Sequence, residues 1–184
     1  MHMKNILKNR TALSTVVTTL IILVVSVLLA GVVTYFAINV TSTRVQEESL
    51  QLTKLHVWYD AGGVQAAFLI MNTGGRDVVI NKLTVRGQQA AWGNVYTAIA
   101  TPTDDLRYST DTLAHLFTVS GTTATAGAAI TAATGDLTLQ SGKSMVVYIS
   151  APDSITINDI GLTVAITVFT SQAMYYQEAN VQAK

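Results

Sequence analysis

An uncharged, apolar stretch from Thr11 to Thr43 constrains this chain more than any other feature of its sequence. Apolar residues fall on every face of the helix that this stretch would form, whereas a surface helix of a soluble protein has a polar face. In lipid the backbone must satisfy its own hydrogen bonds, so a lone segment of this kind is helical. We therefore predict a helix that is buried in a membrane, among copies of itself, or in the two environments in turn.

Three basic residues, Lys4, Lys8 and Arg10, precede the apolar stretch. Positive charge beside a membrane helix favours the cytoplasmic side, so the rest of the chain is expected outside. An ordinary secretory signal has an apolar region of ~7–15 residues that ends at a small-x-small cleavage site. The stretch here is about twice as long, and Leu28 stands where a small residue would be needed before Ala30. An ordinary cleaved signal is therefore disfavoured.

The helix is predicted to cover residues 12–54 and to extend past the membrane edge. Ile38, Val45 and Leu52 recur at seven-residue spacing and form one apolar stripe on an otherwise polar stretch. An amphipathic half of this kind needs a partner, which we expect to be the domain that follows.

Small residues recur every four positions within the apolar stretch, at Ser26, Ala30 and Thr34, with Gly31 alongside. Such a stripe lets a second helix approach closely, which predicts a helix–helix packing face. The alternative is that these residues reflect only the general abundance of small residues in membrane helices.

From Leu55 onward the hydrophobic period changes to two, which predicts strands. Residues 162–169 and 145–149 alternate in this way, and Val146 and Tyr148 are expected to face outward. Several short strands at regular spacing, separated by turn residues, indicate a β-sandwich or barrel. The predicted fold class is therefore α+β: a long N-terminal hydrophobic helix, then an all-β, immunoglobulin-like sandwich head over residues 55–184.

A hairpin is predicted between Val64–Met71 and Val78–Gly87. The turn residues Asn72–Asp77 would join them, because their two glycines permit positive φ. The middle of the domain has little periodicity, so residues 101–135 are expected to be exposed loops with short strands.

The sequence holds no constellation that points to catalysis, a cofactor or a metal. The three histidines lie at no metal-ligand spacing with one another or with a carboxylate. His56 is expected to be a surface or interface residue, and Asp104–Asp105 with Asp111 a solvated turn rather than a calcium loop. The chain has no cysteine, zero net charge and no basic run, which argues against thiolate chemistry and nucleic-acid binding. We expect no enzyme and no cofactor.

This arrangement resembles archaeal type IV pilins. The string Lys8–Val17, followed by Thr18–Val40, is similar to their basic leader, cleavage region and uninterrupted apolar helix. Weaker likeness extends to the head, in Asn72, Gly74, Ile80, Leu83, Val85, Gly87 and Leu139–Gly142. The resemblance implies that residues 1–11 are a class III signal leader, which a membrane prepilin peptidase removes on the cytoplasmic side. The freed helix then leaves the bilayer and packs with other copies in a filament core.

The processing region implied by the resemblance is Lys8, Arg10, Thr11, Ala12 and Leu13. The cut bond is Thr11–Ala12 or Ala12–Leu13, and the first is preferred. Bacterial type IV pilins carry a glutamate five residues into the mature chain, whereas the first acidic residue here is Glu47. This departure favours the archaeal branch of the family.

The function implied is the structural subunit of a cell-surface adhesion filament, a polymer of many identical chains. Its expected partners are the prepilin peptidase, an assembly ATPase with its platform, the cytoplasmic membrane before assembly, and surfaces or other cells afterwards. An archaellin, the motility-filament subunit, remains an alternative with the same helix and head plan. A single-span membrane-anchored β-domain that binds a partner is another alternative. The sequon at Asn39–Thr41 marks a further candidate, an N-glycosylation site.

Overall fold

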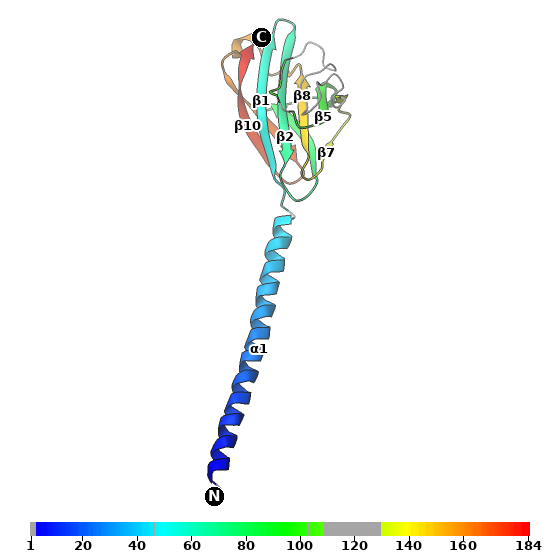
Figure 1. Ribbon diagram of the computed structural model, residues 1–184. Coiled ribbons are helices and arrows are strands. Elements are labelled where there is room, and N and C mark those ends of the chain that lie inside the picture. Colours follow the sequence, from blue (N-terminus) through cyan, green and yellow to red (C-terminus); the bar gives the residue numbers. More distant parts are fainter. Residues whose placement is uncertain (1–2, 46, 103, 109–129) are drawn as a thin grey trace. The chain divides into compact units, whose positions relative to one another are not determined.

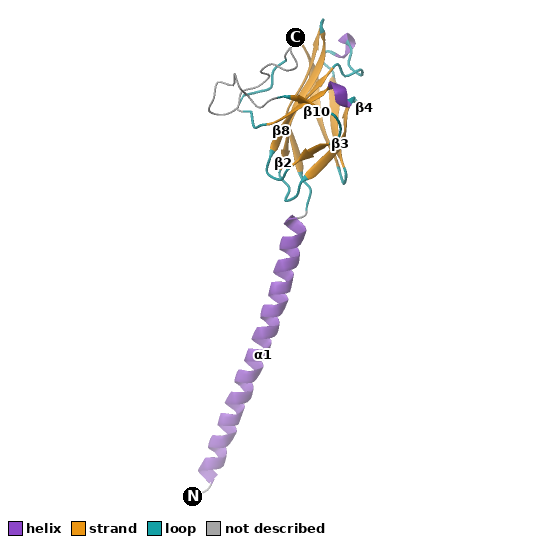
Figure 2. Cartoon of the chain, turned by 90° about the vertical axis from the view of Figure 1, so that its right-hand side faces the viewer, coloured by secondary structure: helices purple, strands orange, loops and turns teal. Residues whose placement is uncertain are grey.

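A computed structural model describes residues 3–45, 47–102, 104–108 and 130–184, and the side chains from Leu13 to Thr43 within the first range (Figure 1). The chain divides into two compact units, Met1–Val45 and Gln46–Lys184. The first contains helix α1, Met3–Val45. The second contains every described strand and is called the head from here on (Figure 2). A long N-terminal apolar helix is therefore followed by a mostly β domain.

The helix ends at Val45, and strand β1 already begins at Leu50, so the predicted helix end at residue 54 is wrong. Leu50 and Leu52 are buried in the head while Gln51 between them is exposed, which is the period of a strand. The seven-residue spacing that includes Leu52 therefore does not mark a helical stripe. Burial of two leucines in a sheet outweighs a local helical pattern that has no partner to cover it.

The head contains ten strands and two 3₁₀ turns among its described residues. The strands and turns are β1 (Leu50–Asp60), β2 (Gly63–Asn72), β3 (Val78–Val85), β4 (Gln88–Gln89), η1 (Trp92–Asn94), β5 (Val95–Ile99), β6 (Thr131–Ala132), β7 (Leu137–Leu139), β8 (Ser144–Ser150), η2 (Ile157–Asp159), β9 (Thr163–Thr170) and β10 (Met174–Ala183).

The strands form one curled sheet in the order β4-β3-β9-β10-β1-β2-β8-β5-β6, with β7 also paired to β3 (Figure 1). One arm is β4-β3-β9-β10 and the other is β1-β2-β8-β5-β6. The two arms join where β1 runs parallel to β10, with Val57 opposite Val181 and Tyr59 opposite Ala183. All the other pairings are antiparallel. The sheet is thus a half-barrel in which the two arms face each other.

The main hydrophobic core lies between the two arms. Ile80 and Ile166 from one arm, and Phe68 and Ile149 from the other, have no exposed surface. Each belongs to a strand in which alternate residues point the same way, so the period-two pattern places them all on the concave side. Burying these side chains provides the main favourable term for folding of the head.

A second apolar cluster lies on the opposite face of the β1-β2-β8-β5 arm. It contains Trp58, Leu69, Val146 and Tyr148, and Leu106 from the segment before residue 109 packs against them. The expectation that Val146 and Tyr148 face outward to solvent is therefore wrong. Both faces of β8 are covered, which explains why its residues from Ser144 to Ile149 are all buried.

Strands β2 and β3 do not pair, so the predicted hairpin is also wrong. β2 lies between β1 and β8, whereas β3 pairs with β9, β4 and β7. The turn between β2 and β3 instead crosses from one arm to the other. The Asn72 side chain holds this crossing, because its amide donates to the carbonyls of Arg76 (2.8 Å) and Leu139 (3.1 Å).

Residues 101–135 combine loop and short strand, as predicted, but their described part is not uniformly exposed. Pro102 and Leu106 are buried, and Thr131–Ala132 form β6. The rest of this predicted loop, 103 and 109–129, lies outside the described residues.

The chain that enters the head is held by the crossing turn. The amide groups of Thr73 and Gly74 both donate to the carbonyl of Ser49, at 2.9 and 3.1 Å. A Cβ at Gly74 would lie 2.6 Å from the carbonyl oxygen of Glu47 and 2.7 Å from the Ser49 nitrogen. This close approach of two backbones requires glycine.

The substitution Gly74→Ala is therefore expected to lower the free energy of unfolding of the head by about 1–3 kcal/mol, because backbone atoms must move apart. Urea denaturation of the full chain in detergent micelles measures the loss. Gly135→Ala is the matched control, since a Cβ there meets nothing within 4 Å. Equal stability of the two variants would contradict the packing described.

Candidate functional site

The apolar side chains of α1 are exposed from Leu13 to Thr43, which makes this surface the candidate functional site. The segment Leu13–Thr43 is long and apolar enough to cross a membrane, and none of it is buried in the chain. Leu29 and Val32, for example, are 65% and 66% exposed. An N-terminal helix of this kind is compatible with membrane insertion, as an anchor or as a signal sequence.

Several hydroxyl groups in α1 donate to carbonyls of the same helix. Ser26 donates to the carbonyl of Ile22 (2.7 Å), and Thr34 donates to that of Ala30 (2.8 Å). Thr18 and Thr43 make the same contact one turn back. Because these donors need no water, the polar residues of the helix do not prevent its burial in lipid or against another helix.

The predicted packing stripe of Ser26, Ala30 and Thr34 lies on successive turns of α1 and so on one face of it. All three side chains are exposed. A Cβ at Gly31 would meet nothing within 4 Å. No contact among the described residues therefore requires a small side chain at this position, and its use as a packing face stays a prediction.

The predicted processing region lies in the helical backbone of α1. Lys8, Arg10, Thr11 and Ala12 belong to its first turns, and their side chains are outside the described set; Leu13 is exposed. Asn39 is also helical, and its backbone carbonyl accepts a hydrogen bond from Thr43. These positions stay predictions.

The described part of the head places His56 and Asp105 together, which the sequence did not indicate. The His56 Nε2 lies 3.0 Å from the Asp105 carboxylate, and the imidazole stacks on Trp58 with ring centroids 5.1 Å apart. Lys54 sits in a bulge of β1 with φ of 52° and donates to the carbonyls of Pro102 and Asp104. These contacts connect Pro102, Asp104 and Asp105 to β1. Asp111 lies outside the described residues.

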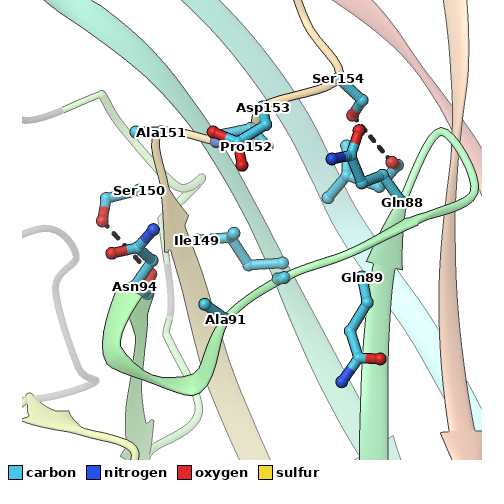
Figure 3. Close-up of a pocket in the computed structure, with 12 residues that line it drawn as sticks. Gln88, Gln89, Ala91, Asn94, Ile149, Ser150, Ala151, Pro152, Asp153 and Ser154 are labelled. Atoms are coloured by element: carbon cyan, nitrogen blue, oxygen red, sulfur yellow. Dashed lines mark hydrogen bonds between the residues drawn. The ribbon is translucent and has the colours of Figure 1, made fainter.

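A pocket opens at the far end of the head, the end at which β1 finishes, with a cavity volume of about 60 Å³ (Figure 3). One side is the β3–β4 hairpin and the segment to Asn94, and the other is the end of β8 with Ala151–Ser154. Two hydrogen bonds fix these walls. Ser154 donates to the carbonyl of Val85 (2.8 Å), and Ser150 donates to that of Asn94 (3.3 Å).

Arg86 and Asp159 hold the same end of the head together. The Arg86 guanidinium donates to the Asp159 carboxylate (2.7 Å) and to the carbonyl of Ser154 (3.2 Å). Asp159 also accepts from the backbone N–H and the hydroxyl of Thr156, which forms a capping box on η2. The Thr156-x-x-Asp159 spacing is a signal for such a cap, whereas nothing in the sequence connects it to Arg86.

No group of three or more His, Cys, Asp or Glu side chains in the described ranges is arranged to hold a metal ion. Comparison with protein-family models and with curated proteins finds no match for this chain. Its function is therefore argued from its own residues.

The pKa of Asp159 is lowered by the hydrogen bonds from Thr156 and by the charge of Arg86, which together outweigh the effect of burial. A carboxyl with a lowered folded pKa stabilises the fold above its unfolded pKa of 3.8, and this contribution is lost as the pH falls through the folded value. We therefore expect the wild-type head to lose this contribution progressively as the pH falls below the unfolded pKa of 3.8.

Urea denaturation of the full chain in micelles at several pH values measures this loss. Asp159→Asn should be less stable than the wild type at pH 7, and the difference should shrink as the pH falls to 2. A difference that stays constant with pH would show that the Asp159 charge does not stabilise the head.

Proposed function

We propose that this chain is the structural subunit of an archaeal type IV pilus-like adhesion filament. Its N-terminal helix polymerises into a helical filament core, and its β-rich head lies outside that core. The observation that carries the proposal is the exposure of the apolar side chains of α1 from Leu13 to Thr43.

The hydrophobic effect requires that such a helix be removed from water. Burying an apolar helix of about 30 residues at roughly 25 cal/mol per Å² stabilises the buried state by tens of kcal/mol per subunit, before ordering costs. Lipid supplies this cover before assembly, and sister helices supply it afterwards. Head-to-tail contacts that do not close into a ring generate an open helical filament, and zero net charge limits repulsion between stacked copies.

The remaining expectations belong to the same proposal. A prepilin peptidase removes the leader, an assembly ATPase and its platform extract the subunit from the cytoplasmic membrane, and the filament attaches cells to surfaces or to one another. The role is structural rather than catalytic. The head is an immunoglobulin-like sandwich in this proposal, which the core between its two facing arms supports.

Ala30→Leu tests the packing face of α1. A larger side chain in the small-residue stripe should hold neighbouring helices apart, so we expect few or no filaments on cells that express the variant. Electron microscopy of purified surface material counts the filaments, and immunoblotting shows that the subunit is still made.

Val32→Leu is the matched control, because it adds apolar volume about half a turn around the helix from Ala30. It should assemble as the wild type does. Normal filaments from Ala30→Leu would contradict the use of the small-residue stripe as a packing face. If wild-type cells that express the chain form no filaments under any condition, the membrane-anchored alternative is favoured.

A further inference from the structure

The pocket at the far end of the head has a polar rim over an apolar floor (Figure 3). The rim includes the side chains of Gln88, Asn94 and Asp153, all of them exposed, whereas Gln89 on the same strand points away from them. The exposed apolar part of the lining comes from Ala91 and Ala151, and the buried residues Ile149 and Pro152 lie beneath it. Ile149 points from β8 toward the Gln88–Ala91 segment, so the floor lies between the two walls.

The rim side chains are available to a ligand. Within the described part of the head, the amides of Gln88 and Asn94 and the carboxylate of Asp153 make no side-chain hydrogen bond. Each amide both donates and accepts, whereas the carboxylate only accepts. Such a set matches a group of neighbouring hydroxyls, which also donate and accept. The walls behind the rim are fixed by the Ser154 and Ser150 hydrogen bonds, so the arrangement is largely formed before binding.

The charge and size of the pocket narrow the ligand class. Its lining, all of it from described residues, includes one carboxylate and no cationic side chain, which disfavours an anion. A volume of about 60 Å³ holds roughly four to six water-sized groups. That is enough for one edge of a pyranose ring with its hydroxyls, whose C–H groups would contact the exposed side chains of Ala91 and Ala151.

From these observations we infer that the far end of the head binds a neutral carbohydrate. The inference deepens the proposed adhesive function, on which it rests for the access of the head to the cell exterior. The pocket is small and open, so a single sugar is held weakly, with a Kd on the order of 1 mM. Many heads on one filament would add avidity to this weak contact.

Saturation-transfer NMR on full chains dispersed in detergent micelles tests the inference. The probes are glucose, galactose, mannose and N-acetylglucosamine, with glucuronate as the anionic counterpart of glucose and glycerol as a polyol without a ring. At least one neutral sugar should bind saturably, and more tightly than glucuronate or glycerol. The double variant Gln88→Ala and Asn94→Ala should weaken that binding about tenfold, because it removes two hydrogen-bonding groups.

The matched control is the double variant Gln51→Ala and Gln182→Ala, which removes two exposed amides outside the pocket and should leave binding unchanged. Thermal unfolding checks that both variants fold as the wild type does. Any of three results would overturn the inference. The first is that none of the four neutral sugars binds saturably, the second is that glycerol binds as tightly as the sugars do, and the third is that the two double variants bind a sugar equally well. Because the chains are dispersed, failure here leaves the filament proposal standing, and failure to form filaments leaves a positive result standing.

Discussion

The apolar surface of α1 must be removed from water, and the proposed filament depends on that requirement. Side chains from Leu13 to Thr43 are exposed in the single chain, while the hydroxyls of Ser26 and Thr34 donate to carbonyls of the same helix. Such a helix is stable in lipid or packed against other copies of itself, but exposing its apolar surface to water is unfavourable in free energy. The proposed function uses both environments in succession, so that one segment acts first as an anchor and then as the core of a polymer.

The head has a hydrophobic core of its own. Its curled sheet encloses one core between two arms, and a second cluster covers the outer face of the β1-β2-β8-β5 arm. Specific polar contacts hold its ends: Asn72 and Gly74 where the chain enters, and Arg86 with Asp159 at the far end. A chain without cysteine therefore relies on packing and hydrogen bonds rather than cross-links.

Sequence reasoning identified the elements better than their arrangement. The uncharged, apolar composition of Thr11–Thr43 predicted the helix, and the two-residue alternation of apolar side chains predicted the strands. Both signals can be read because each lies within one continuous segment of the chain. The Val64–Met71 and Val78–Gly87 strands were found but wrongly paired, since which strands pair is decided by contacts across the fold. Val146 and Tyr148 were assigned to solvent because no local pattern reveals the segment that covers them. The pocket and the His56–Asp105 contact likewise join residues far apart in sequence.

The most direct test is disulfide cross-linking through Ala30→Cys, because the chain has no other cysteine. Filaments purified from the cell surface are oxidised and separated without reductant, and mass spectrometry reads the N-terminus of the subunit. We expect covalent dimers formed through residue 30 and an N-terminus at Ala12 or Leu13. A subunit that stays monomeric in the membrane, with Met1 still attached, would contradict the proposed exchange of lipid for sister helices.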